Sequence, residues 1–523
     1  MPIYVPILVL LVVPAAMLTL RLIRPGFAYH WLVASIGALI AWPLTIFMGF
    51  QLPKSLILSE WQSGTLFPTG LSLEVDQISW PFAVGLVTLV LAVILTDGAR
   101  AAEADWSNWA GSMLLAALGV LAVLAGNPLT ILLTWTALDL VELGVLLNQV
   151  SGSRVRRQVI FAIMTRMVGS GVLIAAGIAA QMQGQVLSFS QIPPLSIFLI
   201  LLAAGLRLGI LPFHVPFLRE LPLRRGLGTM LRLVPVAASL VLVSRVALAQ
   251  ENSAEPFLLS TLMLALVGLA SLFAGVAWLL APNVLDGRSA WILITASLAI
   301  ASAIRGSMAA SMAWGLASIF LGGQIFLASI RERRFAWILW VGLAALSALP
   351  FTPTWNGTFL FASPYLPVLI LFQISLVFLF LGFARQSERK GDSLIGVERW
   401  VLLIYPLGLL LLPLAFFIYG WLNRPSLAEV PLAGWLVGPI TVLMAIPGVW
   451  LRRQEARLTG RFLESIRSLF SFSWFFNLVN AVFHLVERFV RFVSDILEGE
   501  GGVLWALLWV VMLITLIWAG WGG

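Results

Sequence analysis

Apolar runs of about twenty residues recur along the whole chain, beginning with Ile3–Leu20. A helix rises about 1.5 Å per residue, so each run can cross the roughly 30 Å hydrocarbon core of a bilayer. Hydrophobic residues make up 60% of the chain and charged residues only 10%, which excludes an ordinary soluble domain. Membrane barrel strands would instead appear as short alternating segments. The predicted fold class is therefore an all-α polytopic membrane protein.

We expect about sixteen transmembrane helices, one for each apolar run. They are predicted at 3–23, 28–50, 80–97, 110–126, 128–148, 157–180, 195–218, 226–249, 257–281, 289–304, 307–329, 334–361, 364–384, 399–421, 431–451 and 503–520. No basic segment precedes the first run and no small-residue cleavage site follows it, so we expect a retained helix rather than a cleaved signal peptide.

Basic residues are distributed unequally between the predicted loops. Loops after odd-numbered helices contain Arg21, Arg24, Arg100, Arg154, Arg156, Arg157, Arg219, Arg224, Arg225, Arg288, Arg331, Arg333, Arg334, Arg385, Arg389, Lys390, Arg399, Arg452 and Arg453. Loops after even-numbered helices contain only Lys54, Arg305 and Arg424. Because basic loops stay in the cytoplasm, the N-terminus is predicted to lie outside a bacterial inner membrane. The net charge of +8 is explained by this topology and by lipid contact, and does not indicate nucleic acid as a partner.

The segment Arg457–Leu497 mixes aromatic and aliphatic residues with charged ones. It is too charged to cross lipid and too apolar for water, so we predict a lateral amphipathic helix over 457–499 on the cytoplasmic side. A surface anchor that lies on the membrane is the alternative. Glycines at 499, 501 and 502 end this helix before the last span.

Three stretches carry a resemblance to a known family. They are VDQISWPFAVGLVTLV at Val75–Val90, NPLTILLTWTALDLVELGVLL at Asn127–Leu147 and LLAAGLRLGILPFHVPFLRELP at Leu201–Pro222. A fourth segment, Ala348–Phe361, shows a weaker resemblance. In this order they resemble the antiporter-like membrane subunits of respiratory complex I (NADH-quinone oxidoreductase), Mrp antiporters and membrane-bound hydrogenases. The lateral helix makes the layout similar to that of the distal complex I subunit.

The resemblance implies two inverted five-helix repeats with broken helices near the bilayer midplane. The expected parts are N-terminal helices at 1–109, a first repeat at 110–250, a second repeat at 251–384, C-terminal helices at 385–456, the lateral helix at 457–499 and a last span at 500–523. Broken-helix positions are expected at Pro212, Pro235, Pro350, Pro353 and Thr358. In this family, each repeat uses a buried lysine whose pKa is set by burial and by a carboxylate partner.

This chain departs from that pattern in both repeats. The family's Trp-Glu pair is Trp135–Thr136 here, and the first-repeat lysine matches Arg207, a residue type that does not lose its proton in proteins. Segments 290–304 and 307–329 of the second repeat contain no Lys, His, Asp or Glu. The two lysines of the chain, Lys54 and Lys390, fall in predicted loops. We therefore expect a degenerate proton pathway, one that lacks the lysines of the family.

Intramembrane charges are costly and are functional by default, and the five residues Asp139, Glu142, Arg166, Arg207 and Arg232 cluster in the first repeat. The candidate proton-pathway residues are Asp139, Glu142, Arg207, His214 and Arg232, with Arg166 in the same cluster. In a functional interpretation, Asp139 or Glu142 titrates and works with His214 against the fixed charge of Arg207. In a structural interpretation, Arg207 and an acid form a permanent buried pair that seals the path. Arg166 and Arg232 could instead snorkel from helix ends.

We expect no catalytic residue, cofactor or metal in this chain. It has no cysteine, and its histidines at 30, 214 and 484 are too scattered to form a metal site. We predict a non-catalytic subunit of an ion-translocating complex, with other membrane subunits and lipid as partners. A stand-alone proton-coupled transporter, an inorganic carbon uptake subunit and a structural scaffold without transport are the alternatives.

Overall fold

A computed structural model describes residues 2–59, 67, 69–100, 105–149, 153–189, 192–211, 213, 224–252, 259–330, 332, 335–364, 366–389, 391, 398–428 and 430–454. Beyond these it describes only 481, 484, 485, 487, 488 and 491. The chain divides into two compact units, Met1–Gln454 and Glu455–Gly523. Most of the predicted lateral helix at 457–499 and the whole predicted span at 503–520 lie outside the described residues.

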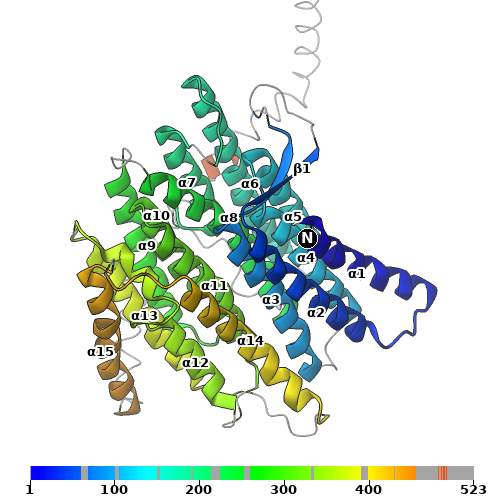
Figure 1. Cartoon of the computed structure of the whole chain (residues 1–523). Coiled ribbons are helices and arrows are strands. Elements are labelled where there is room, and N and C mark those ends of the chain that lie inside the picture. The colour runs from blue at the N-terminus through cyan, green and yellow to red at the C-terminus, as the bar shows by residue number, and fades with distance from the viewer. Residues whose placement is uncertain are drawn as a thin grey trace, which may run out of the picture. The chain divides into compact units, whose positions relative to one another are not determined.

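The described part of the chain is built almost entirely from α-helices (Figure 1). They are α1 (Tyr4–Ile23), α2 (His30–Met48), α3 (Ser79–Asp97), α4 (Trp106–Val123), α5 (Pro128–Gln149), α6 (Ser153–Met182), α7 (Pro194–Leu208), α8 (Arg225–Glu251), α9 (Ser260–Leu280), α10 (Arg288–Ile304), α11 (Met308–Leu327), α12 (Ala336–Leu346), α13 (Leu369–Ser387), α14 (Val401–Leu422) and α15 (Leu432–Gln454). Short 3-10 helices are η1 (Gly49–Gln51), η2 (Gly98–Arg100) and η4 (Trp355–Phe361).

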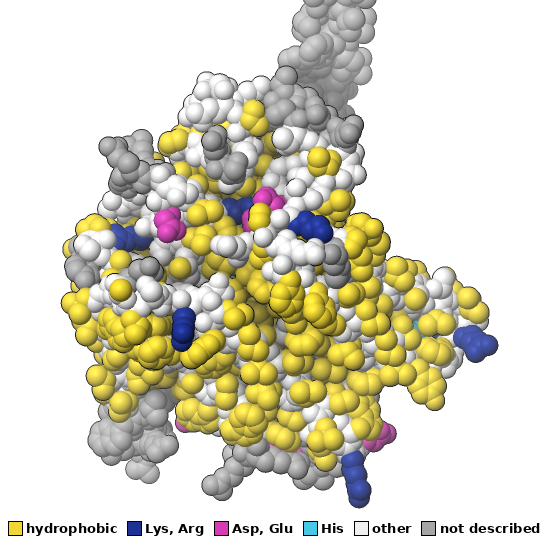
Figure 2. All heavy atoms as spheres, in the orientation of Figure 1, with side chains coloured by type: hydrophobic (Ala, Val, Ile, Leu, Met, Phe, Trp, Pro, Cys, Tyr) yellow, Lys and Arg dark blue, Asp and Glu magenta, His cyan; other side chains and the backbone are white. Residues whose placement is uncertain are grey.

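Eleven of the described helices are long and apolar enough to cross a membrane, and α7, α10, α12 and α15 contribute shorter apolar segments. The all-α, multi-pass fold class predicted from the sequence is confirmed. The helices run broadly side by side in Figure 1, with α1 and α2 on one flank and α15 on the other. Hydrophobic side chains cover most of the face in Figure 2, and charged side chains on it are few.

The helices differ strongly in how much of their surface they bury. Only 22% of the apolar window of α1 is buried, compared with 94% for α8 and 100% for α11. Leu8, Val12 and Leu18 of α1 are exposed. Helices that are apolar all round and buried all round form the centre of a membrane bundle, whereas outer helices direct apolar side chains to lipid. The centre is therefore formed by α3, α8, α10 and α11.

Two predicted helices are wrong at their ends. The helix predicted at 195–218 ends at Leu208, because Gly209 adopts a left-handed φ of 80° that an α-helix cannot continue. The helix predicted at 334–361 ends at Leu346, and positive φ angles at Ala348 (53°) and Phe351 (68°) precede η4. Each predicted repeat thus contains a helix, α7 or α12, that stops at a turn before its predicted end.

A two-stranded antiparallel sheet, β1 (Lys54–Ser59) and β2 (Leu71–Val75), was not predicted from the sequence. The Asn127 amide attaches β2 to the start of α5 by donating to the Gly70 carbonyl at 2.6 Å and to Ser72 Oγ at 2.9 Å. Immediately after β2, Asp76 Oδ1 accepts the backbone N–H groups of Ile78 (3.0 Å) and Ser79 (2.6 Å) at the start of α3. These bonds fix where α3 and α5 begin.

Candidate functional site

Two acidic residues of α5 lie in the interior of the bundle. Asp139 and Glu142 are three residues apart, so they occupy the same face of the helix. Asp139 is 0% exposed and Glu142 is 1% exposed. A buried carboxylate is tolerated only when it is paired and hydrogen-bonded, so the neighbouring helices must supply cations.

The first of these cations is Arg207, in the last turn of α7. Its Nη1 donates to Asp139 Oδ2 at 2.7 Å and its Nη2 to Asp139 Oδ1 at 2.9 Å. Arg207 Nη1 also lies 3.3 Å from the Arg166 carbonyl and 3.2 Å from Ser170 Oγ, both on α6. The planar guanidinium therefore meets the carboxylate in a bidentate pair, which is the strong geometry for these two groups.

The second cation is Arg166 on α6. Its Nη1 lies 2.5 Å from Glu142 Oε2, and its Nη2 lies 3.1 Å from Glu142 Oε1. The same Nη1 is 3.4 Å from Asp139 Oδ1. Arg207, Asp139, Arg166 and Glu142 thus form one continuous chain of alternating charge across α5, α6 and α7. We call these four residues the charge network.

Packing around the charge network fixes the position of Arg207. The Arg207 guanidinium lies 4.3 Å from the centroid of the Trp135 ring, a cation–π distance. Trp135 is itself held by a hydrogen bond from its Nε1 to the Ala238 carbonyl of α8 at 3.2 Å. Gly169 on α6 leaves room for this arrangement, since a Cβ there would lie 2.9 Å from Arg207 Cγ and 2.9 Å from the Ala203 carbonyl.

A third arginine, Arg232 on α8, is 4% exposed and lies within electrostatic reach of Glu142 and Arg166. The cluster therefore contains three cations and two anions. Guanidinium groups keep their protons in proteins, so only the two carboxylates could change charge. Both carboxylates are held by bidentate contacts, and protonating either would leave a buried guanidinium without its anion.

The predicted second repeat contains buried tryptophans, and its helices α10 and α11 have no acidic residue, lysine or histidine within their described bounds. Their one cation within these bounds is Arg288 at the start of α10. Trp278, Trp291 and Trp314 are fully buried. Each donates its Nε1–H to a backbone carbonyl: Trp278 to Leu379 (3.2 Å), Trp291 to Ser318 (3.2 Å) and Trp314 to Gly357 (3.1 Å).

Each of these three rings packs directly against a glycine. A Cβ at Gly382 would lie 2.3 Å from Trp278, one at Gly322 would lie 2.5 Å from Trp291, and one at Gly357 would lie 2.6 Å from Trp314. Thr358, at the expected ion position, uses its hydroxyl to bond the Trp355 carbonyl at 2.7 Å. Trp291 of α10 and Trp314 of α11 are therefore packed against neighbouring glycines, with their indole N–H groups satisfied by backbone carbonyls.

Solved structures share this arrangement of helices. A chain of the membrane-bound sulfane sulfur reductase, an archaeal respiratory membrane complex, superimposes with a TM-score of 0.71 over 99% of both chains at 16% identity. A chain of the Mrp complex from Dietzia sp. DQ12-45-1b gives a TM-score of 0.70 at 14% identity, over 99% of this chain and 63% of that one. This chain has the antiporter-like membrane-subunit fold.

The antiporter-like fold also matches a chain of respiratory complex I from Thermus thermophilus, with a TM-score of 0.58 at 16% identity over 80% of this chain and 97% of that one. No family model matches the sequence, and no curated protein matches it. The likeness expected from the motifs at Val75–Val90, Asn127–Leu147 and Leu201–Pro222 is confirmed at the level of the fold.

Not every predicted site residue joins the charge network. Asp139, Glu142 and Arg207 come together, and Arg232 lies beside them on α8. Pro212 and His214 lie outside the described residues. Of the expected broken-helix positions, Pro235 lies inside the continuous helix α8, Pro350 and Pro353 lie in the turn between α12 and η4, and Thr358 lies within η4. No group of metal-ligating side chains occurs in the described part of this antiporter-like chain.

A second ion pair, in which only the arginine is buried, was not predicted from the sequence. Arg245 of α8 lies 3.0 Å from Asp76 Oδ2 and 3.9 Å from Glu74 Oε2, and its guanidinium lies 5.0 Å from the Phe189 ring centroid. Arg245 falls inside a predicted transmembrane helix, which is a signal that could have identified it. Glu74 lies in β2 and Asp76 directly follows it, and this hairpin was not predicted.

Proposed function

We propose that this chain is a membrane subunit of a multi-subunit ion-translocating complex, and that its own proton pathway is sealed. The fold it shares with chains of complex I, Mrp and sulfane sulfur reductase complexes supports the first part. The charge network supports the second. A proton pathway needs groups that take up and release protons near neutral pH, and the position of the family lysine is occupied by an arginine.

The observation that carries the proposal is the bidentate geometry of both ion pairs. Asp139 offers each of its oxygens to Arg207, and Glu142 offers each of its oxygens to Arg166. Breaking one partner away from such a buried pair costs about 3–5 kcal/mol, so thermal motion rarely opens it. The network then acts as a clamp that joins α5, α6 and α7.

The predicted second repeat supports the same conclusion by a different route. Water or protons would need polar side chains with free donors and acceptors to cross the interior between α10, α11 and η4. Trp291 and Trp314 occupy part of this interior, and their Nε1–H groups bond carbonyls of the protein. The hydroxyls of Ser297 on α10 and Ser318 on α11 are buried without a hydrogen-bond partner among the described residues, but neither is a titratable group. The first repeat is fixed by the charge network, and the second contains buried tryptophans. Such a chain contributes helices to the membrane part of a complex and does not form a channel of its own.

We place the complex in a bacterial inner membrane, with other membrane subunits as partners and the lateral helix on the cytoplasmic side. Because the chain has no cysteine, single cysteines report topology directly. Ser55 and Glu388 are exposed and belong to loops predicted on opposite sides. A membrane-impermeant maleimide applied to intact spheroplasts should label Ser55→Cys and not Glu388→Cys. The reverse pattern would overturn the orientation.

Co-purification tests subunit status. The full chain, carrying an affinity tag and extracted from its native membrane in mild detergent, is expected to elute with other membrane subunits in constant proportion. The Asp139→Asn/Arg207→Leu double variant serves as a comparison, since an unclamped α5–α7 segment should weaken this association. Elution of the wild-type chain alone, in a folded state, would contradict the proposal.

Conduction through the first repeat is a second candidate, favoured by the position of Arg232 near Glu142. Arg232 and Arg166 both lie within electrostatic reach of Glu142, so Glu142 has two guanidinium groups to which it can turn. Movement of Glu142 between them would shift charge along α5 towards α8. This candidate requires Glu142 for proton flux, whereas the sealed pathway does not.

A further inference from the structure

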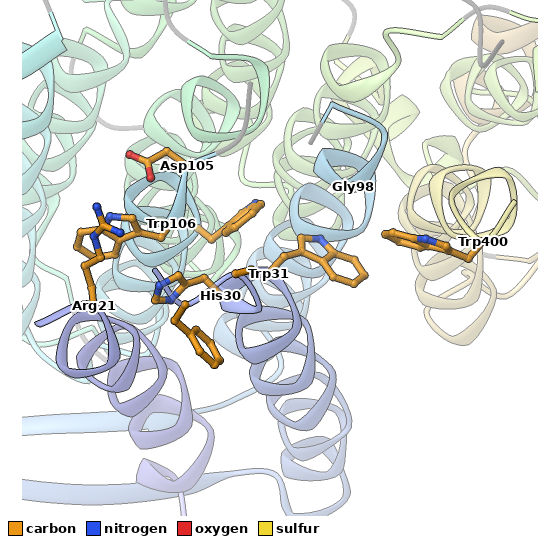
Figure 3. A pocket seen from close by; sticks show the side chains of 10 residues that line it. Arg21, His30, Trp31, Gly98, Asp105, Trp106 and Trp400 are labelled. Carbon is orange, nitrogen blue, oxygen red and sulfur yellow. The ribbon is translucent and has the colours of Figure 1, made fainter. Parts of the chain in front are cut away.

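A pocket of about 360 Å³ opens where five helices begin or end, away from the charge network, with Gly98 at the end of α3 in its wall (Figure 3). Arg21 comes from the last turn of α1, His30 begins α2, Asp105 precedes α4 and Trp400 precedes α14. Trp31, Trp106, Trp109 and Phe27 complete most of the wall. Since these are ends of predicted spans, the pocket lies at the level of lipid headgroups.

Hydrogen-bond donors in this wall have no acceptor in the described part of the chain. His30 is 4% exposed, yet neither of its ring nitrogens has a hydrogen-bond partner there. Trp109 is 8% exposed and its Nε1–H also has no acceptor among the described residues. Buried polar groups are normally satisfied, so an unmatched imidazole and indole facing one pocket indicate a bound acceptor.

The charges around the pocket define the ligand more closely. Arg21 uses Nη1 to bond the nearby Pro25 carbonyl, which holds its guanidinium at the pocket edge. The amino ends of α2 and α4 meet the pocket and add a favourable field for an anion. Asp105 accepts a hydrogen bond from Ser107 Oγ at 3.0 Å. The pocket therefore contains one carboxylate, that of Asp105, beside the hydrogen-bond donors of Arg21, His30 and Trp109.

Trp106 directly follows Asp105 and adjoins it in Figure 3, so one indole can contact a cation paired with this carboxylate, and further tryptophans line the rest of the pocket. Trp31 and Trp400 lie 5.0 Å apart between ring centroids, and Trp106 lies 6.0 Å from the His30 ring. Indole faces attract ammonium groups, and this attraction grows when water is excluded. A ligand with a phosphate for Arg21, His30 and Trp109, and an ammonium for Asp105 and the indoles, would satisfy the whole wall.

We propose that this pocket binds the headgroup of an aminophospholipid. The phosphodiester accepts hydrogen bonds from the Arg21 guanidinium, the His30 ring and the Trp109 indole, and the ammonium pairs with the Asp105 carboxylate. The acyl chains extend along the exposed apolar surfaces of α1 and α2, where Leu22 and Leu32 are exposed. The site is independent of the charge network and of the function proposed above.

Native mass spectrometry of the delipidated full chain tests the site, with phosphatidylethanolamine, phosphatidylglycerol or inorganic phosphate added at equal concentration. Wild-type chain is expected to bind one phosphatidylethanolamine more tightly than phosphatidylglycerol. Arg21→Gln should weaken phosphatidylethanolamine binding about tenfold, the effect of losing one charge-assisted hydrogen bond. His30→Leu should do the same. Arg24→Gln, a basic neighbour that does not line the pocket, should bind as wild type does.

The Asp105→Asn variant distinguishes the ammonium contact from the phosphate contacts. It should remove the preference for phosphatidylethanolamine over phosphatidylglycerol while both lipids still bind. Wild-type binding in Arg21→Gln, whose exposed side chain can change without harm to the core, would overturn the site even if His30→Leu failed to fold. Equal binding of the two lipids by wild type would overturn the ammonium contact. Equal occupancy by inorganic phosphate would overturn the lipid assignment.

Discussion

Arg207 and Asp139 face each other across α7 and α5 in two hydrogen bonds of 2.7 and 2.9 Å, with both side chains excluded from solvent. In the family that this chain resembles, a lysine matching Arg207 is expected to gain and lose a proton. A guanidinium in a bidentate pair keeps its proton, so the same position becomes a fixed contact between helices.

Asp139→Asn tests how strongly this contact holds the bundle. The substitution leaves the Arg207 charge buried with a weaker partner, and we expect it to lower the free energy of unfolding by about 3–5 kcal/mol. Denaturant unfolding in detergent micelles measures the change. Replacing both partners by leucine should cost less than Asp139→Asn alone, because no unpaired charge remains. Wild-type stability of Asp139→Asn would show that the pair contributes nothing.

Arg207→Lys restores the residue type expected from the family. The ammonium keeps the charge but loses the bidentate geometry and the flat contact with Trp135, so we expect a loss of about 1–3 kcal/mol, smaller than that of Asp139→Asn. The same unfolding assay applies. A lysine variant as stable as wild type would mean that the bidentate geometry is dispensable.

Gly322→Ala tests the aromatic filling of the predicted second repeat. A methyl group there would lie 2.5 Å from Trp291 Nε1, and fully buried Trp291 has little room to move. We expect a cost of about 1–3 kcal/mol from overpacking, measured as a lower thermal midpoint. Gly171→Ala in α6 is the matched control, since no atom lies within 4 Å of its added methyl group. Equal midpoints for the two variants would contradict tight packing at Trp291.

Glu487 provides a pH-dependent contact in the second unit, outside the predicted spans. Hydrogen bonds from His484 Nδ1 (3.1 Å) and from Arg491 hold the pKa of the Glu487 carboxyl below its ordinary value of 4.5. Because the folded pKa is lowered, the contact is fully present above pH 4.5 and is lost as the pH falls through the lowered pKa. Isotope-edited infrared titration of the full chain should detect this, and Arg491→Gln should raise the midpoint. An unchanged midpoint in that variant would exclude the Arg491 contribution.

Much of the fold follows from apolar run length alone. Most of the fifteen described helices begin and end close to their predicted residues, because a segment that crosses lipid must satisfy its backbone hydrogen bonds within its own helix. The ends of α7 and α12 were missed because apolarity continues beyond them. Their turns depend on backbone conformation at Gly209, Ala348 and Phe351, which hydropathy does not contain.

The charge network could be predicted only in part. Spacing along α5 places Asp139 and Glu142 on one face, and burial cost predicts that they need cations. The choice of Arg166 for Glu142 and of Arg207 for Asp139 depends on how α6 and α7 cross α5, which spacing within one helix cannot specify. The pocket at His30 was unpredictable for the same reason, since its walls come from helix ends far apart in the sequence.

Proton flux through the assembled complex is the most direct test of the sealed pathway. The complex purified with Glu142→Gln is compared with the wild-type complex in vesicles that contain a pH-sensitive dye, after subunit composition has been matched. The account predicts equal flux, because Glu142 serves only to pair with Arg166. A fall of about tenfold or more in an intact Glu142→Gln complex would contradict it and would make Glu142 part of a working proton path.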